Sequence, residues 1–359
     1  MAEAKWMIYG AYGYTGTLIA EEAVRRGHRP VLAGRSAEKL RPLAERLDLD
    51  WIAVSLDDAD ALREAVATVN LVMHAAGPYV HTAAPMLRAC LDGITSYLDI
   101  TGEIPVFGEV YSLDQAAWER EIALIPGVGF DVVPTDCLAK YVADQVPNPV
   151  TLELAIDALS KTSPGTTKTL LESLPEGGLV RRDGRLRPYS LGQGGRWFSF
   201  PHGRRYAMPI PWGDLATAYR STGIPNITTY LAFSPGAARL ARLAAPLLGG
   251  LLRIGAIRRL VGRIVKRTVK GPDEATRQQA RSYIWAQAAN AEGQESQAWL
   301  ETVEAYRFTA LAAVRAVERV LAERPRGAFT PAQAFGADFV LDIEGTKRYD
   351  TLPALQRTP

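Results

Sequence analysis

The strand, glycine turn and helix at the start of the chain limit its fold more than any other feature. Residues 5–9 form a short apolar run, and residues 17–26 show the apolar periodicity of a helix that ends at Gly27. We predict that the turn between them contacts the pyrophosphate of a dinucleotide, because a close backbone and a positive helix end stabilise phosphate charge. The predicted contact residues are Gly10, Ala11, Tyr12, Gly13, Tyr14, Thr15 and Gly16.

The alternative interpretation of this turn is a structural one, in which the glycines serve packing alone. The chain that follows favours the dinucleotide site, since five more extended segments alternate with helical ones up to residue 125. Parallel strands need a crossover connection, and a helix supplies it. We therefore predict an α/β fold in which residues 1–135 form a Rossmann domain, a doubly wound parallel sheet.

Beyond Pro134 the alternation of strands and helices stops, which predicts a second domain. We assign residues 136–345 to an α+β substrate or dimerisation domain with a mixed or antiparallel sheet, followed by a polar tail over residues 346–359. Asp183-Gly184 between two extended arms is a hairpin signal. The helix expected over residues 308–323 either stays within this second domain or packs back on the Rossmann domain. The expected strands are 151–157, 180–190 with its break, 196–200, 205–209, 228–233, 282–289, 297–303 and 339–343.

The end of the second strand indicates which dinucleotide is bound. An NAD enzyme places a carboxylate there against the ribose 2′-hydroxyl, whereas this chain reads Ala33-Gly34-Arg35-Ser36. Arg35 can pair with a 2′-phosphate, Ser36 can donate a hydrogen bond, and Lys39 lies one helical turn further on. The alternative is a solvated Arg35 and a Ser36 that only caps a helix. The pattern favours NADP(H).

Candidate residues for chemistry follow the fourth and fifth strands, at the sheet edge where such folds bind ligands. We expect Ala76, Gly77 and Pro78 to lie near the nicotinamide. Tyr79 is the first candidate for proton delivery or substrate positioning, followed by His81 and Glu103, although no motif compels these roles.

Several other chemistries are not indicated by the sequence. Cys90 and Cys137 are the only cysteines, and the four histidines lack the spacing of metal ligands, so we expect neither a disulfide framework nor a metal site. The chain has no Tyr-x-x-x-Lys pair, which argues against the short-chain dehydrogenase mechanism. No signal peptide is recognised, so a cytoplasmic location is expected, and we expect no nucleic-acid partner.

Residues 237–270 combine aliphatic side chains with positive charge. They contain nine Lys or Arg and no acid, although the net charge of the whole chain is only +2. One interpretation is a pair of interfacial helices that lie on anionic lipid, at the periphery of a membrane, or that dock an acidic carrier protein. The other is a helical lid or a homodimer face. The sequence leaves these alternatives open.

The motifs together resemble those of the saccharopine dehydrogenase-like NADP-binding family, in the branch that contains trans-acting enoyl reductases. The resemblance implies NADPH-dependent reduction, with a second domain that closes over the nicotinamide, but it does not transfer a substrate. The central section with its basic, apolar stretch departs from the saccharopine-forming enzymes. The resemblance rests on the glycine turn, Ala33–Ser36, Ala76–Tyr79, Tyr97–Glu103, the segment from Pro126 to Asp136, and that from Thr330 to Gly336.

We expect an oxidoreductase in which NADPH delivers hydride to a polarised C=C or C=N bond. The basic, apolar segment favours a hydrophobic acyl or lipid-like substrate, which a carrier protein could present, over a free amino acid. Reduction of an imine derived from an amino acid, or its oxidative reverse, is the alternative chemistry. A different class of function is a membrane-associated adaptor that binds NADP(H) without turnover.

Overall fold

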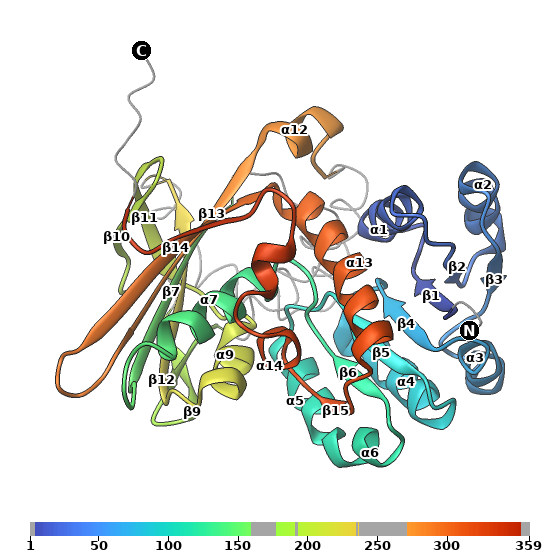
Figure 1. Cartoon of the computed structure of the whole chain (residues 1–359), viewed down its shortest axis with the longest axis horizontal. Helices are drawn as coiled ribbons and strands as arrows, with labels where there is room; N and C mark the ends of the chain where they lie inside the picture. The colour runs from blue at the N-terminus through green and yellow to red at the C-terminus, as the bar shows by residue number, and fades with distance from the viewer. Residues whose placement is uncertain (1–3, 159–176, 191–192, 235, 237–270, 353–359) are drawn as a thin grey trace. The chain divides into compact units, whose positions relative to one another are not determined.

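The computed structural model describes residues 4–158, 177–190, 193–234, 236 and 271–352. It divides into two compact units (Figure 1). The first unit contains Met1–Val133 and Tyr306–Ile343, and the second contains Pro134–Ala305 and Glu344–Pro359. The chain thus leaves the first unit after Val133 and returns to it at Tyr306.

The first unit is built on a seven-stranded sheet of order β15-β6-β5-β4-β1-β2-β3. Every recorded pairing in it is parallel, which confirms the predicted Rossmann-type sheet. Its central strands β1 and β4 are buried along their whole length, as strands covered on both faces must be. The strands are β1 (Trp6–Tyr9), β2 (Val31–Gly34), β3 (Trp51–Ala53), β4 (Leu71–His74), β5 (Ser96–Asp99), β6 (Ala123–Ile125) and β15 (Gly327–Ala328).

Helices cover both faces of this sheet (Figure 1). On one face Arg26, at the end of α1, donates to Glu318 of α13 across 2.9 Å. On the other face α4 lies between α3 and α5. The helices are α1 (Tyr14–Arg25), α2 (Ala37–Leu47), α3 (Ala59–Val66), α4 (Tyr79–Asp92), α5 (Ile104–Ser112), α6 (Asp114–Glu119) and α13 (Ala305–Glu323).

The C-terminal part of the first unit bears on two predictions. The predicted helix over residues 308–323 is α13, and it lies in the first unit, in agreement with the option that it packs back on the Rossmann domain. The residues after it up to Ile343 also belong to the first unit and not to the predicted second domain of residues 136–345, because β15 adds to the parallel sheet beside β6. The Ala328 amide donates to Asp114 across 2.7 Å and holds this two-residue strand in place. The strand predicted for residues 339–343 is a 3-10 helix, η2 (Phe339–Asp342), whose Phe339 ring packs on Phe335 of α14 (Pro331–Phe335).

The second unit contains a mixed nine-stranded sheet, as predicted. Its central order is β10-β11-β12-β7-β13-β14-β16, and β8 pairs with β12 and β9. Only β12 and β7 run parallel among the recorded pairs. Its strands are β7 (Thr151–Ala158), β8 (Gly178–Arg182), β9 (Arg185–Tyr189), β10 (Arg196–Phe200), β11 (Gly203–Pro209), β12 (Asn226–Phe233), β13 (Arg281–Ala289), β14 (Glu295–Val303) and β16 (Lys347–Tyr349). Among its described residues the helices are α7 (Val133–Ala143), α9 (Asp214–Thr222) and α12 (Glu274–Gln279).

Two further sequence predictions concern the second unit. The polar tail predicted for residues 346–359 is wrong at its start, because β16 pairs antiparallel with β14. Tyr349 lies opposite Trp299 and packs against the apolar cluster of the sheet. This packing lets the segment form a strand although its other two residues are charged. The basic stretch of residues 237–270 lies outside the described residues.

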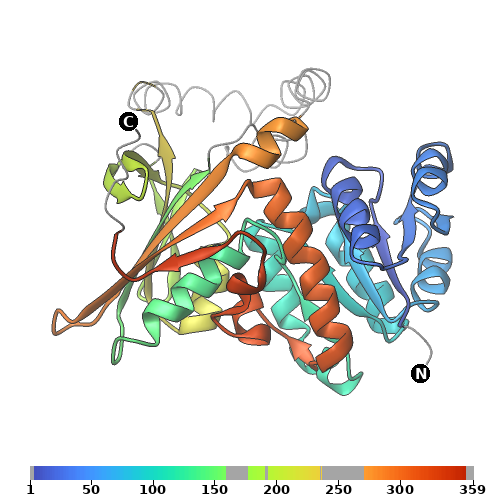
Figure 2. The same ribbon diagram turned by 45° about the horizontal axis from the view of Figure 1, so that its top comes forward.

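An aromatic cluster forms the core on one face of the second sheet, beside the long β13–β14 hairpin that Figure 2 shows in orange. The rings of Phe198 on β10 and Trp285 on β13 lie 5.1 Å apart, although these strands are not neighbours in the sheet. The Trp299 indole donates to the Ser199 carbonyl across 2.9 Å. The sheet is therefore curled, with β10 brought over the face of β13 and β14.

We expect Trp285→Ala to lower the free energy of unfolding by about 3–5 kcal/mol, because it removes a large buried ring from this core. Trp197→Ala on the same sheet is the matched control, since Trp197 is 51% exposed and Trp285 only 7%. The control should change stability by less than about 1 kcal/mol. Urea unfolding followed by circular dichroism measures both, and equal losses would contradict the position of the core.

Candidate functional site

The glycine turn after β1 is packed too closely for side chains at two of its glycines. Gly10 has a φ of +88°, and a Cβ there would lie 2.8 Å from the Ala76 Cβ. A Cβ at Gly16 would strike the Gly10 carbonyl oxygen. The backbone of the turn thus lies against the loop that follows β4, and glycine is the residue that permits this approach. Gly16 serves the packing of the helix on the turn.

The N-terminus of α1 is suited to an anion. Gly13 is its N-cap and has no side chain that could cap the helix, and no acidic residue stands in the first turn. The Thr17 hydroxyl donates to the Ala11 carbonyl across 3.1 Å and fixes the turn to the helix. The Tyr14 ring packs edge to face against Tyr306, so its side chain is turned toward α13. Backbone groups, more than side chains, are available to a phosphate here.

Tyr12 of the glycine turn lies beside the residues predicted to bind the 2′-phosphate. The Tyr12 ring covers Gly34, where an added Cβ would lie 2.7 Å from the ring. The Lys39 ammonium lies 5.7 Å from the centre of the same ring. Arg35 is exposed and makes no hydrogen bond or ion pair with another described residue, and Ser36 begins α2 without a capping hydrogen bond from its side chain. Both side chains remain available to a ligand.

The three predicted catalytic residues lie around the start of α4, and only His81 among them is exposed. Glu103 accepts hydrogen bonds from the Tyr79 and Val80 amides at 3.0 and 2.7 Å, so its carboxylate caps α4. The Tyr79 hydroxyl donates inward to the His74 carbonyl across 3.3 Å, and burial raises the pKa of Tyr79 well above its usual value. His81, in contrast, is exposed in the first turn of the helix. The catalytic roles of all three stay predictions.

A buried polar network behind this loop was not found from the sequence. The Tyr97 hydroxyl donates to Asp99 across 2.7 Å and lies 3.3 Å from the Nδ1 of His74. The other carboxylate oxygen of Asp99 accepts from the Thr101 and Gly127 amides at 2.9 and 2.8 Å. The network therefore ties the ends of β4 and β5 to the loop after β6. The polar residues that alternate with apolar ones at the ends of these strands were the sequence signal that could have indicated this network.

Asp131 adds a third carboxyl group to this edge of the sheet. An added Cβ on Gly102 would lie 3.1 Å from an Asp131 carboxylate oxygen, so the loops after β5 and β6 are in contact. Burial, together with the nearby charge of Glu103, raises the pKa of Asp131 to about 6. The edge is thus able to hold a proton near neutral pH.

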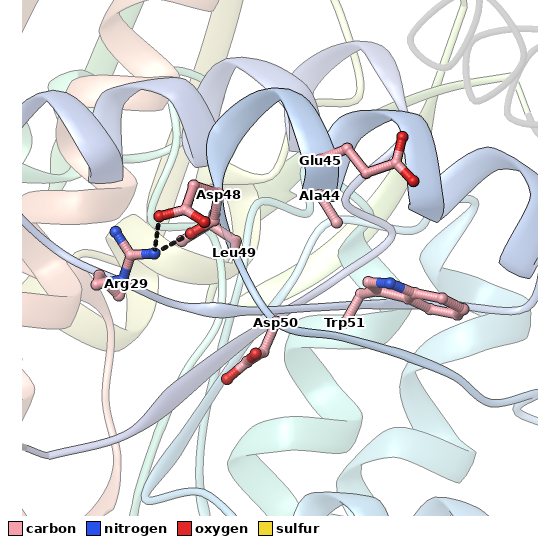
Figure 3. A pocket seen from close by; sticks show the side chains of 7 residues that line it. All are labelled: Arg29, Ala44, Glu45, Asp48, Leu49, Asp50 and Trp51. Carbon is pink, nitrogen blue, oxygen red and sulfur yellow. Dashed lines mark hydrogen bonds and ion pairs between the residues drawn. The ribbon is translucent and has the colours of Figure 1, made fainter.

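A shallow pocket of about 220 Å³ lies elsewhere in the first unit (Figure 3). It is lined by the C-terminal end of α2 and the start of β3, including Trp51 and Asp48. The Arg29 guanidinium donates to Asp48 across 2.7 Å, as the dashed lines in Figure 3 mark. None of the predicted cofactor residues lines this pocket, so it is separate from the glycine turn. Among the described residues, no group of three or more His, Cys, Asp or Glu is placed to hold a metal ion.

We expect Gly34→Ala to weaken NADPH binding at least about tenfold, because the new methyl group would displace the Tyr12 ring from the site. Gly108→Ala is the matched control, since Gly108 lies in α5 with open space around it and should bind NADPH like the wild type. Isothermal titration calorimetry measures both. Unchanged affinity of the Gly34 variant would remove Tyr12 from the site.

The buried carboxyl of Asp99 makes a pH-dependent contribution to stability. Burial raises its pKa from 3.8 to about 6, so the folded chain holds a proton that the unfolded chain releases. This contribution is complete below pH 4 and is lost as the pH rises through 6, by up to about 3 kcal/mol. The stability of Asp99→Asn relative to the wild type should therefore increase over this range. Urea titrations at several pH values measure both proteins. If the stabilities of the wild type and of Asp99→Asn changed in parallel with pH, the raised pKa of Asp99 would be contradicted.

Comparison with known proteins agrees with the geometry of the first unit. Residues 6–124 match the family model described as the saccharopine dehydrogenase NADP binding domain. A saccharopine dehydrogenase-like oxidoreductase of Bos taurus is 29% identical over 161 residues, which cover 39% of this chain and 37% of the relative. A trans-acting enoyl reductase of Mycobacterium tuberculosis is 34% identical over 138 residues, or 36% of this chain and 33% of the relative.

The whole chain has the fold of a solved structure. It is similar to the saccharopine dehydrogenase (L-Glu forming) of Saccharomyces cerevisiae, with a TM-score of 0.68 over 97% of this chain and 100% of that one. At 13% identity this likeness shows the fold alone. The sequence matches to the curated relatives span about a third of the length of those relatives. The domain that carries the glycine turn is thus similar to the saccharopine dehydrogenase NADP binding domain, over residues 6–124 of this chain.

Proposed function

We propose that this protein is an NADPH-dependent reductase that delivers hydride to a C=C bond of a hydrophobic acyl or lipid-like substrate. The observation that carries the cofactor assignment is the group of Arg35, Ser36 and Lys39 beside Tyr12 and the glycine turn. No carboxylate ends β2, where one would hold the 2′-hydroxyl of NAD. The match of residues 6–124 to the saccharopine dehydrogenase NADP binding domain supports the same cofactor.

The residues present fit a phosphorylated dinucleotide. The uncapped N-terminus of α1 can take the pyrophosphate, whereas that of α4 is already occupied by the Glu103 carboxylate. Gly10 lets the turn lie directly against the loop after β4, because a Cβ there would lie 2.8 Å from the Ala76 Cβ. The exposed guanidinium of Arg35 can pair with the 2′-phosphate in two hydrogen bonds. When bound, NADPH supplies the hydride, and these residues bind and orient it.

Among the three predicted catalytic residues, His81 is the best placed to provide a proton. Its imidazole is exposed in the first turn of α4, directly after the loop expected near the nicotinamide. The Tyr79 hydroxyl is turned into the core, and both carboxylate oxygens of Glu103 accept from backbone amides. Tyr79 and Glu103 would then position the loop that carries His81.

The choice of a C=C bond rests on the similarity to the trans-acting enoyl reductase. Reduction of a C=N bond is the second candidate, which the likeness to saccharopine dehydrogenase-like proteins favours. An adaptor that binds NADP(H) without turnover is the third. Incubation with NADPH and a panel of enoyl thioesters, imines and keto acids separates them, since oxidation is followed at the absorbance of NADPH. If no compound of the panel is reduced although NADPH binds tightly, the protein is an adaptor that binds NADP(H) without turnover.

We expect Arg35→Asp to weaken NADPH binding by roughly 10- to 100-fold, because a charged hydrogen-bonded pair is lost and a repulsive one is introduced. NADH binding should change much less, since NADH lacks the 2′-phosphate. Arg88→Glu is the control for the change in net charge, because Arg88 is exposed on α4. An equal loss for NADPH and NADH in calorimetry would withdraw the preference for the phosphorylated cofactor.

We expect His81→Gln to lower kcat by roughly 100-fold, because general acid catalysis contributes about that much. NADPH affinity should stay that of the wild type. The measurement is steady-state kinetics on whichever substrate of the panel is turned over. A variant that keeps the kcat of the wild type would show that the proton comes from another group.

A further inference from the structure

Three neighbouring side chains form an exposed patch on the outer face of the β10–β11 hairpin. We call Trp197, Arg204 and Tyr206 the arginine–tryptophan patch. Trp197 lies opposite Tyr206 in the register of the two strands, and their rings meet edge to face at 5.7 Å. The Arg204 guanidinium lies 5.7 Å from the centre of the Trp197 ring. The alternate residues of β10, Phe198 and Phe200, are buried in the aromatic core.

Trp197 is a large apolar side chain that stays exposed on this hairpin, whereas Phe198 and Phe200 of the same strand are buried. Trp197 is 51% exposed, on a strand that among the described strands pairs with β11 alone and so forms an edge of the sheet. Trp118 of the first unit is similarly exposed at 59%, but no described arginine or lysine lies over its ring. Tryptophan, tyrosine and arginine gathered on one surface are the residue types that bind partners most strongly. The patch is therefore more than a scattered apolar residue.

The charge of the patch is also unbalanced. The arginines on either side of it are paired with acids of β7, Arg196 with Glu153 and Arg205 with Asp157. Arg204 has no carboxylate partner among the described residues and is exposed. A cation that remains available beside an indole ring favours an anionic partner with an apolar interior.

The chain beyond this hairpin has the same sign of charge. Tyr206 lies opposite Phe233, the last residue of β12. Residues 237–270, which begin four positions later in the sequence, carry nine positive charges and no negative one. Like charges make this segment a poor occupant of the patch. An external anionic surface would be attracted by both.

We propose that the arginine–tryptophan patch docks on an anionic lipid surface. Tryptophan and tyrosine rings sit favourably at the level of lipid headgroups, and an arginine there pairs with lipid phosphate. A hairpin edge presents its side chains outward, which suits a flat surface better than it suits a protein groove. The patch belongs wholly to the second unit, so the proposal stands or falls independently of the proposed reduction.

The test is co-sedimentation of the full-length protein with vesicles of phosphatidylcholine and phosphatidylglycerol in equal parts. We expect binding to these vesicles, weakening as salt is raised, and little binding to pure phosphatidylcholine. Trp197→Ala and Arg204→Glu should each weaken binding roughly tenfold or more, since each removes an anchor at the surface. Trp118→Ala and Arg88→Glu are matched controls that should bind vesicles like the wild type, and NADPH affinity should be unchanged in all four variants.

Three results would overturn the proposal. The first is no binding of the wild type to anionic vesicles. The second is binding that survives both patch substitutions, which would place the contact in another part of the chain. The third is polyglutamate that binds as tightly as the vesicles and with the same sensitivity to Trp197→Ala, which would make the partner an acidic protein.

Discussion

The close approach of two backbone segments, the turn after β1 and the loop after β4, is the constraint on which the proposed site depends. A single methyl group on Gly10 would collide with Ala76. Because the segments meet without side chains between them, the first turn of α1 and the loop leading to α4 lie at one edge of the sheet. The N-cap of α1 makes no side-chain hydrogen bond, while Glu103 caps α4, and this difference is why the proposed pyrophosphate site is at α1.

The alternation of strands and helices in the first domain was predictable because each element carries its own periodicity. The cofactor residues stay predictions, which rest on their fixed offsets from the strands and helices of this domain. The roles around α4 were not, because Tyr79 and Glu103 differ from catalytic groups only in what they contact. The inward hydroxyl of Tyr79 and the capping carboxylate of Glu103 depend on packing between β4, α4 and the loop after β5. The network of His74, Tyr97 and Asp99 likewise joins distant parts of the sequence.

Long-range pairing also explains what was missed at the C-terminal end. Gly327–Ala328 is a strand of only two residues that forms because β6 offers an edge. In the sequence, Lys347–Tyr349 has the composition of a polar tail, but it forms a strand because it pairs with β14. In the second sheet, the salt bridges of Arg196 and Arg205 to β7 fasten the β10–β11 hairpin over its aromatic core, and Trp197 remains on the outside. Among the described residues no helix is both long and apolar enough to cross a membrane.

The central claim is that the glycine turn and Arg35 together hold a dinucleotide bearing a 2′-phosphate. A crystal structure of the full-length protein grown with NADPH tests it most directly. The account requires the pyrophosphate over the first turn of α1 and the 2′-phosphate within hydrogen-bonding distance of Arg35 and Ser36. A cofactor whose 2′-phosphate points into solvent, or one that binds away from the turn, would contradict it.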